Sequence, residues 1–238
     1  MKKLIWLLPF AVSGCLGEKY RSPERNPFRT VKRVAVAPFL DRTGTKGFDG
    51  KKAGDAFAAE LLMHSGFDVV RPGQVADAAA AKGLKLDTAD DYIAVARALD
   101  ADAIVAAEVT EMNTFYPPRT SVALQLLLTQ RVKAPSEDLE RHVVSARPLA
   151  ISPATALHLD QHFELVADAG NDNIESSLSS YAAARTAEDS PWKDGEGIAR
   201  SREPYWRFVC ALLVDRIIDI ELSRPAPARF KWSNPEHP

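Results

Sequence analysis

The stretch from Val31 to Asp41, which reads V-K-R-V-A-V-A-P-F-L-D, contains an unbroken apolar run at residues 34–37. Such a run is typical of a strand covered on both faces, because neither set of alternating side chains needs water. Pro38 predicts the end of this strand, since proline cannot donate a hydrogen bond to a sheet ladder. A loop at residues 42–47 and a helical pattern follow. The order strand, loop, helix is the opening unit of an α/β layer.

Helical patterns and short apolar runs continue to alternate up to residue 109. We expect helices over 51–65, over 75–82 and from Thr88 onward, and further strands over 67–72 and 103–109. Thr88 is a suitable helix cap, because its hydroxyl can accept a hydrogen bond from a free backbone N–H. Strands that are separated by helices favour right-handed crossovers and parallel pairing.

The pattern changes after residue 119. Residues 120–130 alternate between apolar and polar, which indicates an antiparallel strand with one wetter face, and 162–168 is expected to pair beside it. Later helices are predicted from the capping-box pair Asp172 and Glu175 and from Pro204 in a first turn. The region 188–202 is polar and is expected to be irregular.

The predicted fold class is therefore α/β. We expect a single three-layer-like domain over residues 31–223, with an insertion at 131–157. Its mixed sheet has parallel first strands and antiparallel later strands, and helices flank it. Hydrophobic residues form 46% of the chain, which is enough for a sizeable core.

The amino terminus reads as a lipoprotein signal peptide over residues 1–14. Two lysines precede an apolar segment that is too short to span a bilayer, and Val12-Ser13-Gly14-Cys15 follows. These four residues resemble the bacterial lipobox, whose cysteine becomes acylated. The alternative is an ordinary secretory signal with a chance cysteine. Several acyl chains on Cys15 would meet the two-anchor requirement for stable membrane attachment. Leu16 stands where a retention signal would show Asp, and by resemblance to lipoprotein sorting this favours the outer membrane.

Segments without periodicity flank the predicted domain. Residues 15–30 are polar and contain two prolines, so we interpret them as a lipidated flexible tether. Residues 224–238 read as a disordered tail, in which Phe230 and Trp232 are either a docking point or lightly packed aromatics.

The charge balance argues against a partner that binds by electrostatic attraction over a wide surface. The formal charge is −2, and losing Lys2 and Lys3 with the signal peptide makes it −4, so nothing attracts nucleic acid or anionic lipid over a wide surface. Once Cys15 is lipidated only Cys210 remains, so no disulfide forms within the chain. Cys210 lies in the apolar stripe of the last helix and is expected to be a buried, inert thiol.

Three segments carry a resemblance to known proteins. They are V-A-V-A-P-F-L-D-R-T at 34–43, G-F-D-V-V at 66–70 and A-L-D-A-D-A-I-V at 98–105. With the order of elements, they resemble a group of bacterial envelope proteins that includes CsgG, the amino-terminal domain of TolB, and LpoB. A glycine often follows the third strand in that group, and Ala107-Glu108 stands there here. The resemblance implies an envelope interaction module without a cofactor, and no catalytic residue carries over from it.

Possible catalytic and ligand motifs are incomplete. The loop at 45–52 lies where a P-loop would lie, but Thr45 replaces its first glycine and Lys52 replaces the magnesium-binding hydroxyl. His158 and His162 are four residues apart, yet Leu159 stands where a zinc protease has its glutamate. If this segment is extended, the two rings lie about 13 Å apart and cannot share a metal.

Two further candidates are weak. Ser190 and Lys193 match S-x-x-K in a polar setting without its companion motifs. Glu108 and Glu111 lie near one strand end, where paired acids are usually solvated. We therefore predict no catalytic residue, no metal and no cofactor, and the chain is not expected to be an enzyme.

A possible partner-binding loop lies at residues 113–119, N-T-F-Y-P-P-R. Phe115, Tyr116 and Arg119 are residue types favoured at binding hot spots, and two prolines stiffen the loop. The alternative is a turn whose aromatics pack on the domain.

The sequence thus predicts a lipid-anchored, periplasm-facing, non-catalytic module at the outer membrane. It would bind an envelope protein in envelope assembly or cell-wall maintenance, and it could form a homo-oligomer. The first alternative is a subunit of an oligomeric secretion pore, for which residues 120–130 are the candidate spanning strand. The second is a hydrolase, which would need a nucleophile or metal site.

Overall fold

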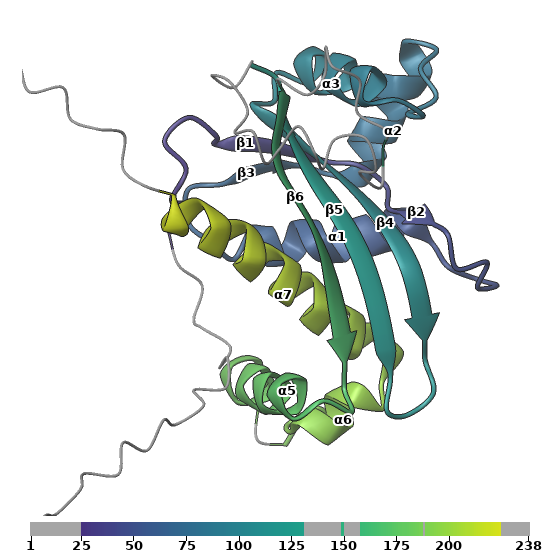
Figure 1. The fold of residues 1–238 in the computed structure, drawn as a ribbon, viewed down its shortest axis with the longest axis vertical. Helices are drawn as coiled ribbons and strands as arrows, with labels where there is room; N and C mark the ends of the chain where they lie inside the picture. Colours follow the sequence, from purple (N-terminus) through teal and green to yellow (C-terminus); the bar gives the residue numbers. More distant parts are fainter. Residues whose placement is uncertain (1–24, 131–148, 150–157, 188, 225–238) are drawn as a thin grey trace, which may run out of the picture.

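A computed structural model describes residues 25–130, 149, 158–187 and 189–224. The described chain forms one six-stranded mixed sheet in the order β3-β1-β4-β5-β6, with β2 pairing to β4 off this path (Figure 1). The strands are β1 (Arg33–Val36), β2 (Leu40–Asp41), β3 (Asp68–Val70), β4 (Ala103–Asn113), β5 (Arg119–Leu128) and β6 (Leu159–Asp168). Pairs among the first four strands are parallel, and β4-β5-β6 is antiparallel, which confirms the predicted mixed α/β sheet.

Helices cover both faces of the sheet. They are α1 (Gly50–Leu61), α2 (Pro72–Ala81), α3 (Ala89–Ala98), α5 (Asp172–Arg185), α6 (Gly195–Ala199) and α7 (Arg202–Ser223). One core cluster joins the sheet to α1, α5 and α7, and a second joins it to α2 and α3 (Figure 1). Strand β1 contributes to both clusters, because Val34 and Val36 face the first cluster and Ala35 faces the second. The apolar run at 34–37 is therefore covered on both sides, as its sequence predicts.

Helix ends follow the local chemistry for the most part. Thr88 caps α3 and accepts from the Asp91 N–H, as predicted, and Pro204 lies in the first turn of α7. The cap of α5 differs from the expected one. Asn171 accepts from the Asn173 N–H, so Asp172 is the first residue of the helix and not its cap.

Two elements, β2 and α6, are not predicted from the sequence. The chain rejoins the sheet after Pro38 as β2, where Leu40 pairs with Glu108, because proline interrupts the ladder for only a short distance. The short helix α6 lies within the region that was expected to be irregular. Asp194 caps it by accepting from the Gly197 N–H at 2.7 Å.

The prediction that β5 has one wetter face is wrong. Residues 120–127 are buried on both faces, because β5 lies between β4 and β6 and is covered on either side. On the side away from α7, the Gln125 side chain bonds the backbone of Leu149 in both directions, at 3.0 and 3.2 Å. The segment proposed as a spanning strand is thus interior to the domain. In the described part of the chain, no helix has the length and apolar character that crossing a membrane requires.

Contacts with the domain begin before residue 31. The Asn26 N–H donates to Ser65 O at 3.0 Å, and its side chain donates to Val31 O at 2.8 Å. The rings of Phe28 and Phe67 meet edge to face with centroids 6.2 Å apart. The predicted signal peptide, Cys15, nearly all of the insertion at 131–157 and the tail from 225 onward lie outside the described residues.

Candidate functional site

The loop between β4 and β5 is held rigidly at its base. The Tyr205 hydroxyl of α7 donates to Ala167 O at 2.7 Å, and Pro118 O is a second acceptor at 3.2 Å. Burial, together with the charge of Asp168, raises the pKa of Tyr205 above its usual range, so this hydroxyl stays a donor at any physiological pH. The Ala169 N–H donates to Pro118 O at 2.9 Å. One side chain of α7 thus links Pro118, at the end of the loop, to Ala167 on β6.

The two aromatic residues of the loop differ in their surroundings. Phe115 is 83% exposed, which is the highest value among the large apolar side chains of the described residues. Its N–H is bonded to Asn113 Oδ1 at 3.0 Å, so its backbone is held while its ring remains in solvent. Tyr116 is half exposed, and the guanidinium carbon of Arg200 lies 4.2 Å from its ring centroid. The alternative of packed aromatics therefore describes Tyr116 but not Phe115.

Arg119 takes part in an ion-pair row across three strands. Its side chain lies 3.3 Å from Glu111 Oε2 on β4 and 3.8 Å from Asp168 Oδ2 on β6. All three side chains are about half exposed, so each pair adds little to stability. Arg119 is thus balanced by two acids at the base of the loop, and it is not placed at the tip beside Phe115.

A second exposed aromatic, Trp192, lies on the segment that leads to α6, the helix whose C-cap Arg200 contacts Tyr116 of the loop. Trp192 is partly exposed, and its Cα approaches Gly197 so closely that a Cβ at Gly197 would lie 3.3 Å from it. Arg200, which stacks on Tyr116, follows the same helix and is bonded to Glu196 at 2.8 Å. We call Phe115, Tyr116, Trp192 and Arg200 the tip surface. The sequence gives no signal for Trp192 and Arg200, because their link to the loop is made only by the fold.

The incomplete motifs all have structural partners. At the P-loop position, the Asp49 carboxylate accepts from the N–H groups of Lys51 and Lys52 at 3.0 and 3.1 Å. A carboxylate therefore occupies the place where a phosphate would bind at this helix start. The Ser190 hydroxyl accepts from the Trp192 N–H, and the backbone N–H of Lys193 donates to Ser190 O at 3.2 Å, so both bonds belong to a local turn.

The histidine and glutamate candidates do not form a ligand set. His158 Nδ1 lies 2.8 Å from Leu128 O, and His162 lies on β6, in extended backbone. Glu108 is buried and lies 3.0 Å from Arg42 Nε, whereas Glu111 pairs with Arg119. Within the residues described above, no group of three or more His, Cys, Asp or Glu side chains is arranged to hold a metal ion.

Cys210 is buried in the core cluster of α7, as the sequence predicts. Burial raises the pKa of its thiol well above the usual value, and the charge of Glu60 adds to this while Arg207 opposes it. A thiol in this setting is not ionised at neutral pH and is a poor nucleophile.

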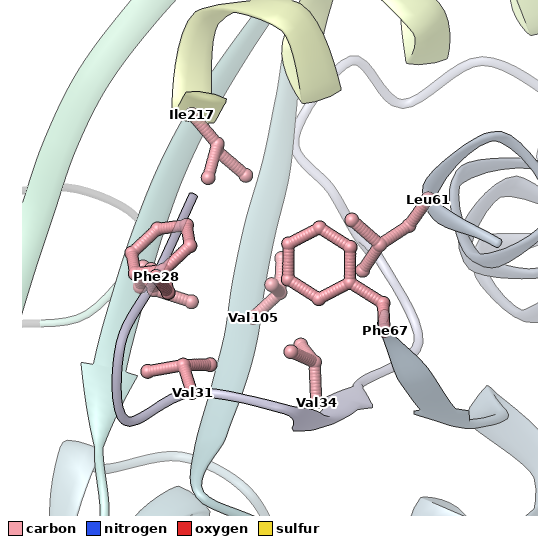
Figure 2. Close-up of a pocket in the computed structure, with 8 residues that line it drawn as sticks. Phe28, Val31, Val34, Leu61, Phe67, Val105 and Ile217 are labelled. Atoms are coloured by element: carbon pink, nitrogen blue, oxygen red, sulfur yellow. The ribbon is translucent and has the colours of Figure 1, made fainter. Parts of the chain in front are cut away.

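An apolar cavity lies at the other end of the sheet, beneath the entering chain. Phe28, Phe67 and Ile217 close it from three sides (Figure 2). Its free volume is about 10 Å³ and its lining has no polar surface, so it offers a water no hydrogen-bond partner. It is a small packing gap and not a ligand pocket.

Comparisons with known proteins give structural neighbours only. No protein-family model matches the sequence, and a search of curated proteins finds no match. Among solved structures, the C-terminal domain of LpoB from Salmonella enterica aligns with 60% of this chain and 87% of that chain, at 14% identity and a TM-score of 0.41. The lipoprotein GNA1162 from Neisseria meningitidis aligns with 79% of this chain and 99% of that one, at 14% identity and a TM-score of 0.40.

A third neighbour is the hypothetical protein CT253 from Chlamydia trachomatis. It aligns with 81% of this chain and 99% of its own, at 14% identity and a TM-score of 0.41. LpoB is a member of the group that the sequence resembles, so the resemblance to LpoB is found again among solved structures, at low identity. At these TM-scores no residue role or activity passes from the neighbours to this chain.

Proposed function

We propose that this protein is a lipid-anchored module of the bacterial envelope that binds a protein partner through the tip surface and performs no catalysis. The anchor follows from the signal sequence and Cys15. The binding role is supported by one observation above all. The most exposed large apolar side chain of the described residues, Phe115, lies on a loop that Tyr205 contacts at Pro118 O and links to β6.

Rigidity matters because a preorganised loop loses little conformational entropy when a partner covers it. Large aromatic side chains and arginine are enriched at binding hot spots, and the tip surface combines both kinds. Exposing an aromatic side chain to water is unfavourable, so the burial of Phe115 by a partner contributes favourably to the free energy of binding. We place the module at the periplasmic side of the outer membrane, with a role in envelope assembly or cell-wall maintenance.

The binding role is tested by photo-crosslinking in intact envelopes. A photoreactive residue at position 115 is expected to give a discrete adduct with an envelope protein, and the same residue at Leu222 is not. Leu222 is a matched control, because it is a half-exposed apolar side chain at the far end of α7. Binding of the identified partner should fall at least about tenfold in Phe115→Ala, since truncating a hot-spot residue costs about 2 kcal/mol. Equal adducts at both positions would contradict the proposal.

The anchor is tested separately. Mass spectrometry of the amino-terminal peptide should show acyl chains on Cys15, and fractionation should place the protein in the outer membrane. Cys15→Ala should release the protein from the membrane pellet without changing its binding to the partner in solution. An unmodified Cys15 in the wild-type protein would contradict the lipid anchor. So would a Cys15→Ala variant that is found in the membrane pellet as fully as the wild type.

A further inference from the structure

The end of α7 meets the start of β6 in a corner with an unusual charge arrangement. Arg224, which caps α7, donates from Nη1 to Asp160 Oδ1 at 2.9 Å and from Nη2 to Asp160 O at 2.9 Å. The same Nη1 lies 2.8 Å from Glu221 Oε2. Two carboxylates therefore share one guanidinium group. The Asp160 side chain is only 3% exposed and that of Glu221 18%, whereas Arg224 is 39% exposed, so the two acids are buried and solvent reaches the corner from the guanidinium side.

Three buried acceptor atoms of Asp160, Gln161 and Glu221 lack a hydrogen-bond donor among the described residues. These atoms are Asp160 Oδ2, Gln161 Oε1 and Glu221 Oε2. The short contact between Arg224 and Glu221 lacks the alignment of a hydrogen bond and is an ion pair only. Leaving a buried acceptor without a donor costs about 1–3 kcal/mol, and more when it is charged. The corner carries one negative charge in excess when both acids are ionised.

A proton on Glu221 would remove both problems at once. It cancels the excess charge, and a protonated Glu221 is no longer a buried charged acceptor without a donor. The groups that act on Glu221 are Asp160 from β6 and Arg224 from its own helix. Burial raises the pKa of Glu221 above its usual value; Arg224 opposes this shift and Asp160 adds to it.

We propose that a proton on Glu221 controls how tightly the end of α7 is fastened to β6 through Arg224 and Asp160, and that the fastening is tighter in mildly acidic than in neutral solution. The direction follows from linkage. An acid that binds its proton more firmly in the docked state favours docking when protonated, and this gain is lost as the pH rises through its pKa in the docked state. The contact lies at the opposite end of α7 from Tyr205, so both ends of this helix are tied to β6.

Hydrogen exchange of the full-length protein in detergent tests the proposal. The protection factors of the backbone amides at 218–223 should be higher at pH 5 than at pH 7.5. The gain can reach about tenfold for each unit by which docking raises the pKa. Glu221→Gln carries a permanent donor without charge, so its protection at pH 7.5 should equal that of the wild type at pH 5, and its pH dependence should disappear. Glu203→Gln, an exposed site in the first turn of α7, should keep the wild-type response.

Three outcomes would overturn the proposal. The wild-type protection could be the same at both pH values, or its pH dependence could persist in Glu221→Gln. In addition, calcium chloride at pH 7.5 could reproduce the acidic protection, which would show that the corner takes a metal cation and not a proton. Asp160→Asn provides a second variant, because removing the neighbouring charge should reduce the difference between the two pH values.

Discussion

Glu60 of α1 and Arg185 of α5 form a buried ion pair, with 2.7 Å between Glu60 Oε2 and Arg185 Nη2. Arg207 of α7 approaches the other oxygen of Glu60 at 3.2 Å. The Glu60 carboxylate is 1% exposed, so one buried charge joins three helices that are far apart in the sequence. A buried charge is tolerated only when it is paired in this way.

Glu60→Ala should therefore destabilise the domain strongly. It leaves the partly buried Arg185 without its carboxylate, and breaking a buried pair costs about 3–5 kcal/mol. Urea unfolding measures the change. Asp68→Asn is the control, because its pair with Arg33 is exposed, and it should lose at most about 1 kcal/mol. Similar losses in the two variants would show that the buried pair has no special role.

Much of the fold is predictable because short sequence patterns, such as apolar runs and capping residues, mark its strands and helices. The covered strand at 34–37 and the cap at Thr88 are both predicted correctly, because an apolar run and a capping residue can be recognised from a few adjacent residues. By contrast, β2 has two residues and α6 has five, which is too short for a period to be seen. Their formation depends on tertiary contacts such as the pairing of Leu40 with Glu108.

The candidate site is predictable only in part for the same reason. Phe115 and Tyr116 stand out in the sequence as aromatics beside two prolines. Arg200 does not, because its contact with Tyr116 arises when α6 folds against the loop. Arg119 has a suitable residue type for a hot spot, but the strands place it between Glu111 and Asp168. Residue type alone does not reveal such a partner.

Tyr205→Phe should loosen the loop that carries Phe115. The variant keeps the ring but removes the hydroxyl that donates to Ala167 O on β6 and lies 3.2 Å from Pro118 O at the end of the loop. The expected loss is about 1–2 kcal/mol in the free energy of unfolding, and faster hydrogen exchange of the amides at 114–116. Faster exchange throughout the sheet, with no larger effect at the loop, would contradict a local role for Tyr205.

Phe28→Ala should show that the folded unit begins before residue 31. Phe28 packs on Phe67 and closes the apolar cavity, so truncating this half-buried ring should cost about 1–3 kcal/mol. Phe115→Ala removes the same ring from an exposed position and should change stability by less than about 0.5 kcal/mol. Thermal unfolding of the two variants makes the comparison, and equal melting temperatures would place Phe28 outside the folded unit.

Cys210 should act as a reporter of unfolding. In a Cys15→Ser background, a thiol reagent at pH 8 should leave the native protein unlabelled, because the thiol is buried and burial raises its pKa. Labelling should appear along the same urea transition as the loss of tryptophan fluorescence. Rapid labelling of the native protein would contradict the buried position.

The raised pKa of the Cys210 thiol also predicts how the stability of the fold changes in alkaline solution. The thiol of the unfolded chain ionises near its ordinary value of 9.0, whereas the folded protein keeps the proton to higher pH. A raised pKa in the folded state stabilises the fold below pH 9, and this contribution is lost above it, by about 1.4 kcal/mol per pH unit. Cys210→Ala removes this ionisation, so its free energy of unfolding should decline less steeply between pH 9 and 10.5 than that of the parent. Parallel curves for the two proteins would mean that the thiol ionises equally in both states.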